Sequence, residues 1–282
     1  MSYPIVLLWL FGGLFLAYLL FSLWRRVEAA KLERMLRTMP FPDAYRRHLS
    51  RIAHYNALET DERSRVEKAV LRFIHTKEFR GIRLEVTDEM RAVVAFYAAL
   101  TALGKSGDPY ARLATVLLYS GAFLVEEKIN DKGIVTSGEF ELDGQSSEDT
   151  IVFSWEDAQR EAYELSPDNV VIHECAHLLD FSEGEGNPWI EAVDEAYGEY
   201  IERLESDGDH PGAELLGEYA AENEAEFFAV SSERFFHTPL RLKQKVPELF
   251  RALTGFYGCD PSRRGVEAKW PEETSSAFRN GI

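Results

Sequence analysis

The sequence predicts an α+β fold, mostly helical with a small sheet, preceded by one N-terminal helix that crosses a membrane. Three observations lead to this prediction. Segments with helical periodicity outnumber the few short segments that alternate like strands. The run from Tyr3 to Trp24 carries no charge, which suits a bilayer. A third segment, Asn169 to Asp180, is apolar on nearly every side of a helix yet contains His-Glu-x-x-His.

Composition limits the function classes that this chain of 282 residues can serve. The formal net charge is −17, and the acidic residues are spread along the chain, so the phosphates of a nucleic acid would be repelled. We therefore expect no nucleic-acid partner. The only cysteines are Cys175 and Cys259, which indicates no disulfide framework and fits a reducing compartment.

The N-terminal run is the first element in chain order. Tyr3 to Trp24 would form a helix about 33 Å long, enough to cross a bilayer core. The pair Arg25 and Arg26 follows it, whereas neither a basic region before it nor a small-residue cleavage site is evident. We expect a retained single-pass anchor in the inner (cytoplasmic) membrane, with the domain after it in the cytoplasm.

The remaining elements follow from periodicity, capping residues and turn residues. Pro40 and Pro42 end a helix that leaves the membrane. The expected helices are 27–39, 45–57, 62–74, 88–103, 189–204, 223–236 and 247–256, and the expected strands are 81–86 and 114–119. Residues 134–142 and 150–153 read as a hairpin, and Ser154 to Asp157 as a capping box. We divide the chain into an anchor (1–26), a helical stem (27–60), a domain that contains the His-Glu-x-x-His segment (61–262) and a polar tail (263–282).

The segment with His-Glu-x-x-His has the spacing of a zinc peptidase helix. Positions i and i+4 share one helical face, so His173 and His177 can bind one metal ion, and Glu174 is placed beside a water on that ion. Ser166 and Pro167 read as the start of this helix, and Gly184 as its end. The competing interpretation is a pair of hydrogen-bonded core histidines, which the apolar, capped helix makes less favourable.

A catalytic zinc site of this kind needs a third protein ligand. No third histidine lies close behind His177, and His210 and His237 are distant candidates. A carboxylate is favoured, but spacing alone does not choose between the acidic residues of the stretch from Tyr219 to Val230 and Asp180. Those acidic residues are Glu222, Glu224 and Glu226.

At this point the chain resembles a known family, the Mlc titration factor A family of zinc peptidases, whose catalytic core is similar to that of anthrax lethal factor. The matching segments are 152–157, 169–180, the Gly-Asn-Pro loop 186–188, 219–226 and 232–236. The resemblance covers roughly residues 35–260 and implies a zincin-type metallopeptidase domain. It also implies that Glu226 is the third zinc ligand and that Tyr219 points into the site.

From the motif and the resemblance together we expect a membrane-anchored, Zn²⁺-dependent metallopeptidase that acts on a peptide or protein substrate. Glu174 would be the general base, and the Tyr219 hydroxyl would donate a hydrogen bond to the oxyanion. Asp180 is expected to orient an imidazole N–H, while Glu233 could do the same or be a surface charge. The alternative function is a membrane-tethered regulator that sequesters a cytoplasmic transcription factor, with zinc mainly structural, because the family's namesake binds a transcriptional repressor.

Overall fold

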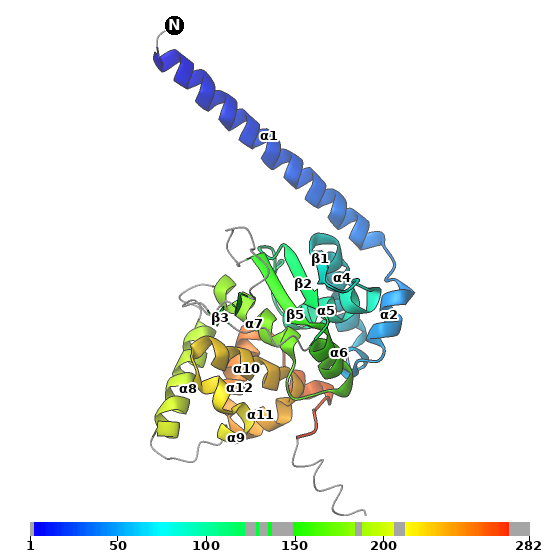
Figure 1. The fold of residues 1–282 in the computed structure, drawn as a ribbon, viewed down its shortest axis with the longest axis vertical. Coiled ribbons are helices and arrows are strands. Elements are labelled where there is room, and N and C mark those ends of the chain that lie inside the picture. Colours follow the sequence, from blue (N-terminus) through cyan, green and yellow to red (C-terminus); the bar gives the residue numbers. More distant parts are fainter. Residues whose placement is uncertain are drawn as a thin grey trace, which may run out of the picture. The chain divides into compact units, whose positions relative to one another are not determined.

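The computed structural model describes residues 3–121, 128–129, 135–136, 149–183, 188–205 and 212–270 (Figure 1). The chain forms two compact units, residues 1–41 and residues 42–282. The boundary between them falls inside the segment that we expected to be a helical stem, 27–60.

The first unit is a single helix, α1 (Tyr3–Thr38). It continues without a break from the apolar run into the charged segment that begins at Arg25, and the chain leaves the helix just before Pro40, as predicted. Within the part of the chain that the structure describes, no helix has both the length and the apolar character needed to cross a membrane. The transmembrane helix expected within residues 1–26 is therefore not found there.

The second unit begins with α2 (Asp43–Leu49), α3 (Ala53–Asn56), α4 (Thr60–Thr76) and α5 (Asp88–Thr101). The expected single helix over 45–57 is two short helices, because Ile52 between them has an extended backbone. Helix α5 starts at a capping residue, Thr87, and is buried from Met90 to Thr101 except at Arg91, so it forms the centre of this half of the core.

A parallel sheet of three strands follows the order β1 (Glu78–Ile82), β2 (Thr115–Tyr119), β5 (Thr150–Ser154). Strand β1 ends earlier than the predicted strand 81–86, because Arg83 has a positive φ of 57°, which turns the backbone. The predicted hairpin is wrong in its described part. Strand β5 pairs in parallel with β2, and β4 (Val135–Thr136) pairs with β3 (Lys128–Ile129); residues 137–148 lie outside the described residues.

Helices form most of the chain after the sheet, which confirms a mostly helical fold with a small sheet. They are α6 (Trp155–Glu164), α7 (Val170–Glu183), α8 (Pro188–Glu205), α9 (Ala213–Leu216), η2 (Glu218–Ala221), α10 (Glu224–His237), α11 (Pro239–Lys245), α12 (Pro247–Tyr257) and η3 (Pro261–Arg264). Helix α7 contacts α5, β5 and α10, so it lies at the centre of the second unit (Figure 1). An aromatic cluster around Tyr257 joins α10 to α12. Of the predicted tail, 263–282, residues 263–270 are described and include the buried Val266 and Ala268; residues 271–282 lie outside the described residues.

Candidate metal centre

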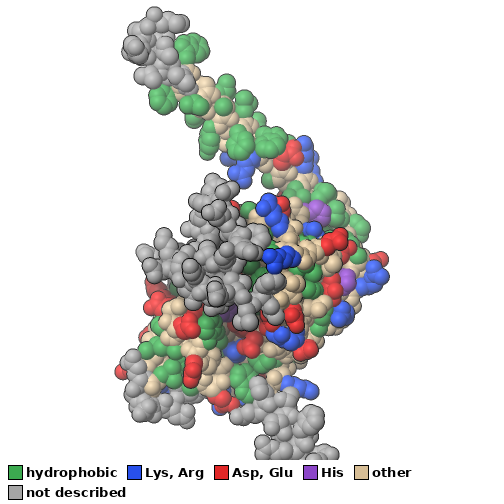
Figure 2. Space-filling model, viewed as in Figure 1, with side chains coloured by type: hydrophobic (Ala, Val, Ile, Leu, Met, Phe, Trp, Pro, Cys, Tyr) green, Lys and Arg blue, Asp and Glu red, His purple; other side chains and the backbone are tan. Residues whose placement is uncertain are grey.

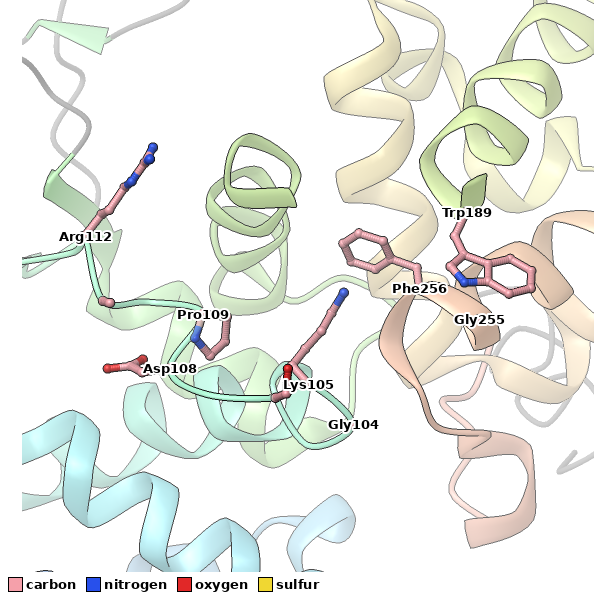
Figure 3. Close-up of a pocket in the computed structure, with 10 residues that line it drawn as sticks. Gly104, Lys105, Asp108, Pro109, Arg112, Trp189, Gly255 and Phe256 are labelled. Carbon is pink, nitrogen blue, oxygen red and sulfur yellow. The ribbon is translucent and has the colours of Figure 1, made fainter. Parts of the chain in front are cut away.

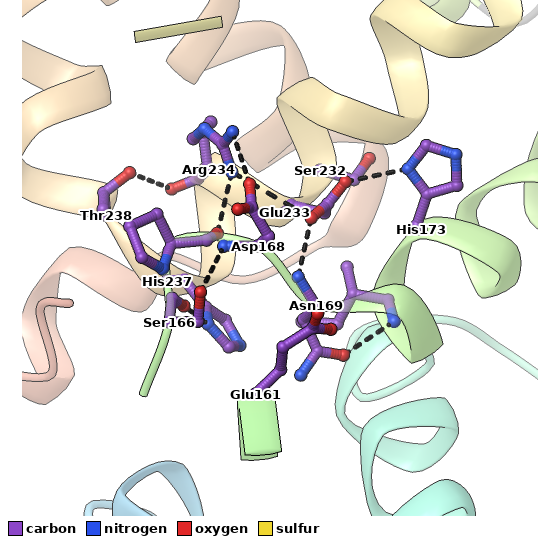
Figure 4. A network of polar contacts seen from close by, with 12 residues as sticks. Glu161, Ser166, Asp168, Asn169, His173, Ser232, Glu233, Arg234, His237 and Thr238 are labelled. Carbon is purple, nitrogen blue, oxygen red and sulfur yellow. Dashed lines mark hydrogen bonds and ion pairs between the residues drawn. The ribbon is translucent and has the colours of Figure 1, made fainter. Parts of the chain in front are cut away.

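The motif helix α7 starts at Val170, three residues later than we predicted. The Asn169 side chain accepts a hydrogen bond from the Ile172 N–H (3.0 Å), as a helix-capping residue does. Two further N–H groups at the start of the helix donate to carboxylates: Val170 to Glu161 (2.7 Å) and Asn169 to Glu233 (2.6 Å) (Figure 4). The helix ends at Glu183, and Gly184, its predicted end, lies outside the described residues.

His173 and His177 lie on one face of α7, as the i, i+4 spacing predicts. Their Nε2 atoms are 3.2 Å apart. Glu226, in the first turn of α10, reaches both rings: its carboxylate oxygens lie 3.0 Å from His173 Nε2 and 3.6 Å from His177 Nε2. The three ligand atoms all lie within 4.8 Å of one another, so two helices far apart in sequence bring three donors to one point.

These donors fit a tetrahedral cation. The Nδ1–H of His173 donates to Glu233 Oε1 (2.8 Å), which leaves the Nε2 lone pair directed at the same point as His177 Nε2. Glu226 Oε2 is buried, and its polar contact among the described residues is the His173 imidazole, with Nε2 3.0 Å away. Ligands about 2.0–2.1 Å from a tetrahedral zinc are separated by about 3.3–3.4 Å, close to the 3.2 Å between the two Nε2 atoms.

The charges around the three metal-ligand side chains stabilise a positive charge between them. Burial lowers the pKa of His173, but hydrogen bonds to Glu226 and Glu233 more than offset this effect and raise the pKa to about 10. Burial raises the pKa of Glu226, and its hydrogen bonds with His173 and His177 more than offset this, so that its pKa falls well below the usual value. A divalent cation held by these three side chains would supply that positive charge and would compete with protons for the imidazole nitrogens.

Glu174 and Tyr219 both lie beside the donors. Burial raises the pKa of the Glu174 carboxyl, and the charges of His177 and His173 oppose that rise only in part. The Tyr219 ring, on η2, stacks on the His173 ring with a centroid separation of 5.9 Å, and the residue is 50% exposed. Burial and the nearby Glu226 carboxylate raise the pKa of Tyr219 far above its usual value, so the hydroxyl keeps its proton.

The structure separates the candidates that spacing alone had left open. Glu222 and Glu224 are exposed, and Glu226 is the carboxylate that meets the histidines. Asp180 is half-buried on α7, and among the described residues it makes no hydrogen bond to an imidazole, so it does not take the orienting role that we expected for it. His237 is buried and bonds through Nδ1 to Ser166 O (2.5 Å); His210 lies outside the described residues.

Glu233 holds the orienting position instead. It is only 5% exposed, and its two carboxylate oxygens bond to His173 Nδ1 and to the Asn169 N–H. The sequence contained a signal for this contact, since Glu233 lies two helical turns beyond Glu226 and therefore on a similar face of α10. Arg234, which lies beside Glu233, was not singled out from the sequence.

Two further features of the second unit do not belong to the centre. The thiol of Cys175 is buried, and burial raises its pKa to about 12, with Tyr110 as a hydrogen-bond partner. A separate hollow of about 550 Å³ is lined by Lys105, Arg112, Trp189 and Phe256 among other residues (Figure 3). It contains none of the residues that the sequence predicted for the site.

Comparison with known proteins agrees with the class of protein that this centre defines, a metallopeptidase. The family described as "Glucose-regulated metallo-peptidase M90" matches residues 23–258. The chain belongs to this family of metallopeptidases. It is also similar to proteins named Mlc titration factor A, which confirms the resemblance inferred from the sequence. The Mlc titration factor A of Pectobacterium atrosepticum is 34% identical over 73% of this chain and 83% of its own length. That of Serratia proteamaculans is 36% identical over 64% of this chain and 73% of its own length.

Proposed function

We propose that this metallopeptidase is zinc-dependent and hydrolyses peptide bonds, with His173, His177 and Glu226 as the metal ligands. The observation that carries the proposal is the convergence of these three donors to within 4.8 Å of one another, with Glu174 next to the first ligand on α7. Two imidazoles and one carboxylate are a known ligand set of catalytic zinc sites, which keep a fourth position open. A purely structural site would not need a general base beside its ligands.

The residues around the donors have distinct roles in the proposed reaction. Zinc bound here would polarise the scissile carbonyl and lower the pKa of a bound water. Glu174 accepts a proton from the attacking water and delivers it to the leaving amine, and its raised pKa suits both steps. The protonated Tyr219 hydroxyl donates a hydrogen bond to the carbonyl oxygen as negative charge develops on it. Glu233 holds the His173 ring so that Nε2 keeps its lone pair.

The test is zinc content and cleavage of a peptide library by the purified full-length protein and its Glu174→Gln variant. We expect about one zinc per chain in both proteins, and hydrolysis lower by about 10²–10⁴-fold in the variant. Glu164→Gln, at the C-terminal end of α6 and outside the site, is the matched control and should cleave like the wild type. Equal cleavage by Glu174→Gln and wild type would reject Glu174 as the base.

We also propose that α1 attaches the protein to the cytoplasmic membrane with the peptidase domain in the cytoplasm. The proposal is supported by apolar side chains exposed along α1, for example Trp9 (75%), Phe11 (68%) and Tyr18 (66%) (Figure 2). A continuous exposed apolar surface of this kind needs lipid or protein to cover it, and Arg25 and Arg26 at its end favour the cytoplasmic side.

Fractionation of cells that express a C-terminally tagged chain tests this attachment. We expect full-length protein in the membrane fraction, with the tag digested by added protease in inverted vesicles but not in intact cells or spheroplasts. Full-length protein in the soluble fraction would contradict membrane attachment. A shortened soluble chain would instead indicate a cleaved signal peptide.

A second candidate function is sequestration of a cytoplasmic transcription factor, with zinc mainly structural. The observation that favours it is the name of the relatives, Mlc titration factor A. The Glu174→Gln variant distinguishes these two functions. A sequestering protein would keep all of its cellular effect in that variant, whereas a peptidase would lose it.

A further inference from the structure

We propose that Arg234 is a positioning residue that holds together two segments that lead into the metal centre. One segment is the start of the motif helix, 166–169, and the other is 213–219, which ends at Tyr219. This inference rests on the proposed peptidase function, because it assigns Arg234 a part in arranging that site. Arg234 itself does not touch the metal ligands.

The Arg234 side chain is buried and uses all three of its guanidinium nitrogens. Its Nε donates to Leu215 O (2.8 Å), and its Nη1 donates to Pro167 O (2.8 Å). Its Nη2 lies 2.7 Å from Asp168 Oδ1. A guanidinium is a rigid planar fork, so three contacts in these directions fix the relative positions of the groups that it binds. Figure 4 shows the side chain between the segment 166–169 and α10.

Both segments lead directly into the site. Pro167 and Asp168 are followed by Asn169, which caps α7, and His173 lies one turn further on. Leu215 belongs to α9, and only three residues separate it from Tyr219. Between them, Gly217 has a φ of +76°, and its carbonyl oxygen accepts a hydrogen bond from the Tyr200 hydroxyl (2.9 Å). Because hydrogen bonds hold this short connection at Leu215 and at Gly217, Tyr219 can move little relative to His173.

The surroundings of Arg234 explain why an arginine suits this position. Two of its partners are backbone carbonyl oxygens, which only a donor with several separated N–H groups can reach together. The partner Asp168 is 63% exposed at its side chain, so this ion pair contributes little by itself. Arg234 Nη1 also lies 4.0 Å from Glu233 Oε2, and the Trp270 ring covers the guanidinium at 5.7 Å. Lysine would keep the charge but could not reach both carbonyls from one rigid group.

The test compares Arg234→Lys and Arg234→Met in the full-length protein, with Arg241→Met as the control. Arg241 lies 5.3 Å from the same Trp270 ring, so the control removes a similar cation from that indole. Three quantities are measured: the zinc Kd by competition with a chelator, kcat and KM separately, and kcat of each Arg234 variant combined with Tyr219→Phe. The zinc Kd requires no hydrolysis, so it is informative even if no peptide is cleaved.

We expect both Arg234 variants to raise the zinc Kd about tenfold and to lower kcat about tenfold, with KM within about twofold of the wild type. When an Arg234 variant is combined with Tyr219→Phe, kcat should be little lower than in Tyr219→Phe alone. The Arg234 variant acts by displacing the Tyr219 hydroxyl, which Tyr219→Phe has already removed. Arg241→Met should resemble the wild type. If Arg234→Met does not fold, Arg234→Lys gives the same measurements. A wild-type zinc Kd in the folded variants, or kcat effects that multiply with Tyr219→Phe, would overturn the proposal.

Discussion

Replacing Glu233 with Gln tests whether the contact between this carboxylate and His173 sets the metal centre. The carboxylate of Glu233 accepts two hydrogen bonds, from His173 Nδ1–H (2.8 Å) and from the Asn169 N–H (2.6 Å). Glutamine has the same shape but only one accepting oxygen. Its NH₂ group would therefore face one of two N–H donors, and either His173 or the first turn of α7 would lose its partner.

The expected cost follows from that count. Losing a charge-assisted hydrogen bond and leaving one buried donor unsatisfied costs about 3 kcal/mol in the free energy of unfolding. For a domain of this size each kcal/mol lowers the melting temperature by about 2–4 °C, so we expect Tm to fall by about 10 °C. The zinc Kd should rise about 10–100-fold, because the imidazole no longer has a fixed tautomer.

Calorimetry and chelator competition on the purified protein measure both effects. Glu224→Gln is the matched control, since it makes the same change in charge on the same helix at an exposed position, and it should change neither quantity appreciably. An unchanged zinc Kd in Glu233→Gln would refute the role of Glu233, whatever its effect on Tm. A lower Tm with an unchanged Kd would show that Glu233 supports the fold only.

Three further predictions concern the ligands, the oxyanion donor and the acid side of the stability profile. His177→Ala and Glu226→Ala should lose bound zinc whereas Glu222→Ala keeps it, as measured by metal analysis after dialysis; retained zinc in Glu226→Ala would reject the third ligand. Tyr219→Phe should lower kcat with little change in KM, because its hydroxyl acts mainly in the transition state; steady-state kinetics in which only KM changes would contradict this. Burial lowers the pKa of His237 to about 4, below its unfolded value of about 6.5, so the unfolded chain binds the extra proton and stability falls as pH drops from about 6.5 to about 4. In urea unfolding, the loss of unfolding free energy between pH 7 and pH 5 should be about 2 kcal/mol smaller in His237→Asn than in the wild type.

The part of the site that lies on one helix could be predicted from the sequence, and the part that joins helices could not. His173 and His177 needed only the i, i+4 rule. The choice among Glu222, Glu224 and Glu226 depends on where α10 crosses α7, which no spacing within one segment specifies; the family resemblance supplied it. Asp180 was expected to orient an imidazole because it shares the helix with the ligands, whereas the buried partner, Glu233, comes from the other helix.

The fold shows the same division between local and non-local information. Helices α5, α8, α10 and α12 lie close to their predicted ranges, because periodicity and capping residues are local signals. The motif helix starts at Val170 rather than near Pro167, since Glu161 and Glu233 satisfy its first N–H groups from outside the segment. Strand β5 was paired with a neighbour in sequence, whereas it lies parallel to β2, a pairing that requires a long crossover and leaves no turn motif to recognise.

The buried thiol of Cys175 allows the transient opening of the motif helix to be measured by its rate of alkylation. Its pKa of about 12 leaves almost no thiolate at neutral pH, and the thiolate is the species that an alkylating reagent attacks. Cys175 can therefore react only while α7 is detached from the core. The rate at which iodoacetamide labels this cysteine, followed by mass spectrometry with Cys259 resolved as a separate peptide, gives the free energy of that opening. If the metal binds α7 to α10 through Glu226, saturating zinc should slow the labelling, and the ratio of the two rates would measure how strongly the ion holds the two helices together.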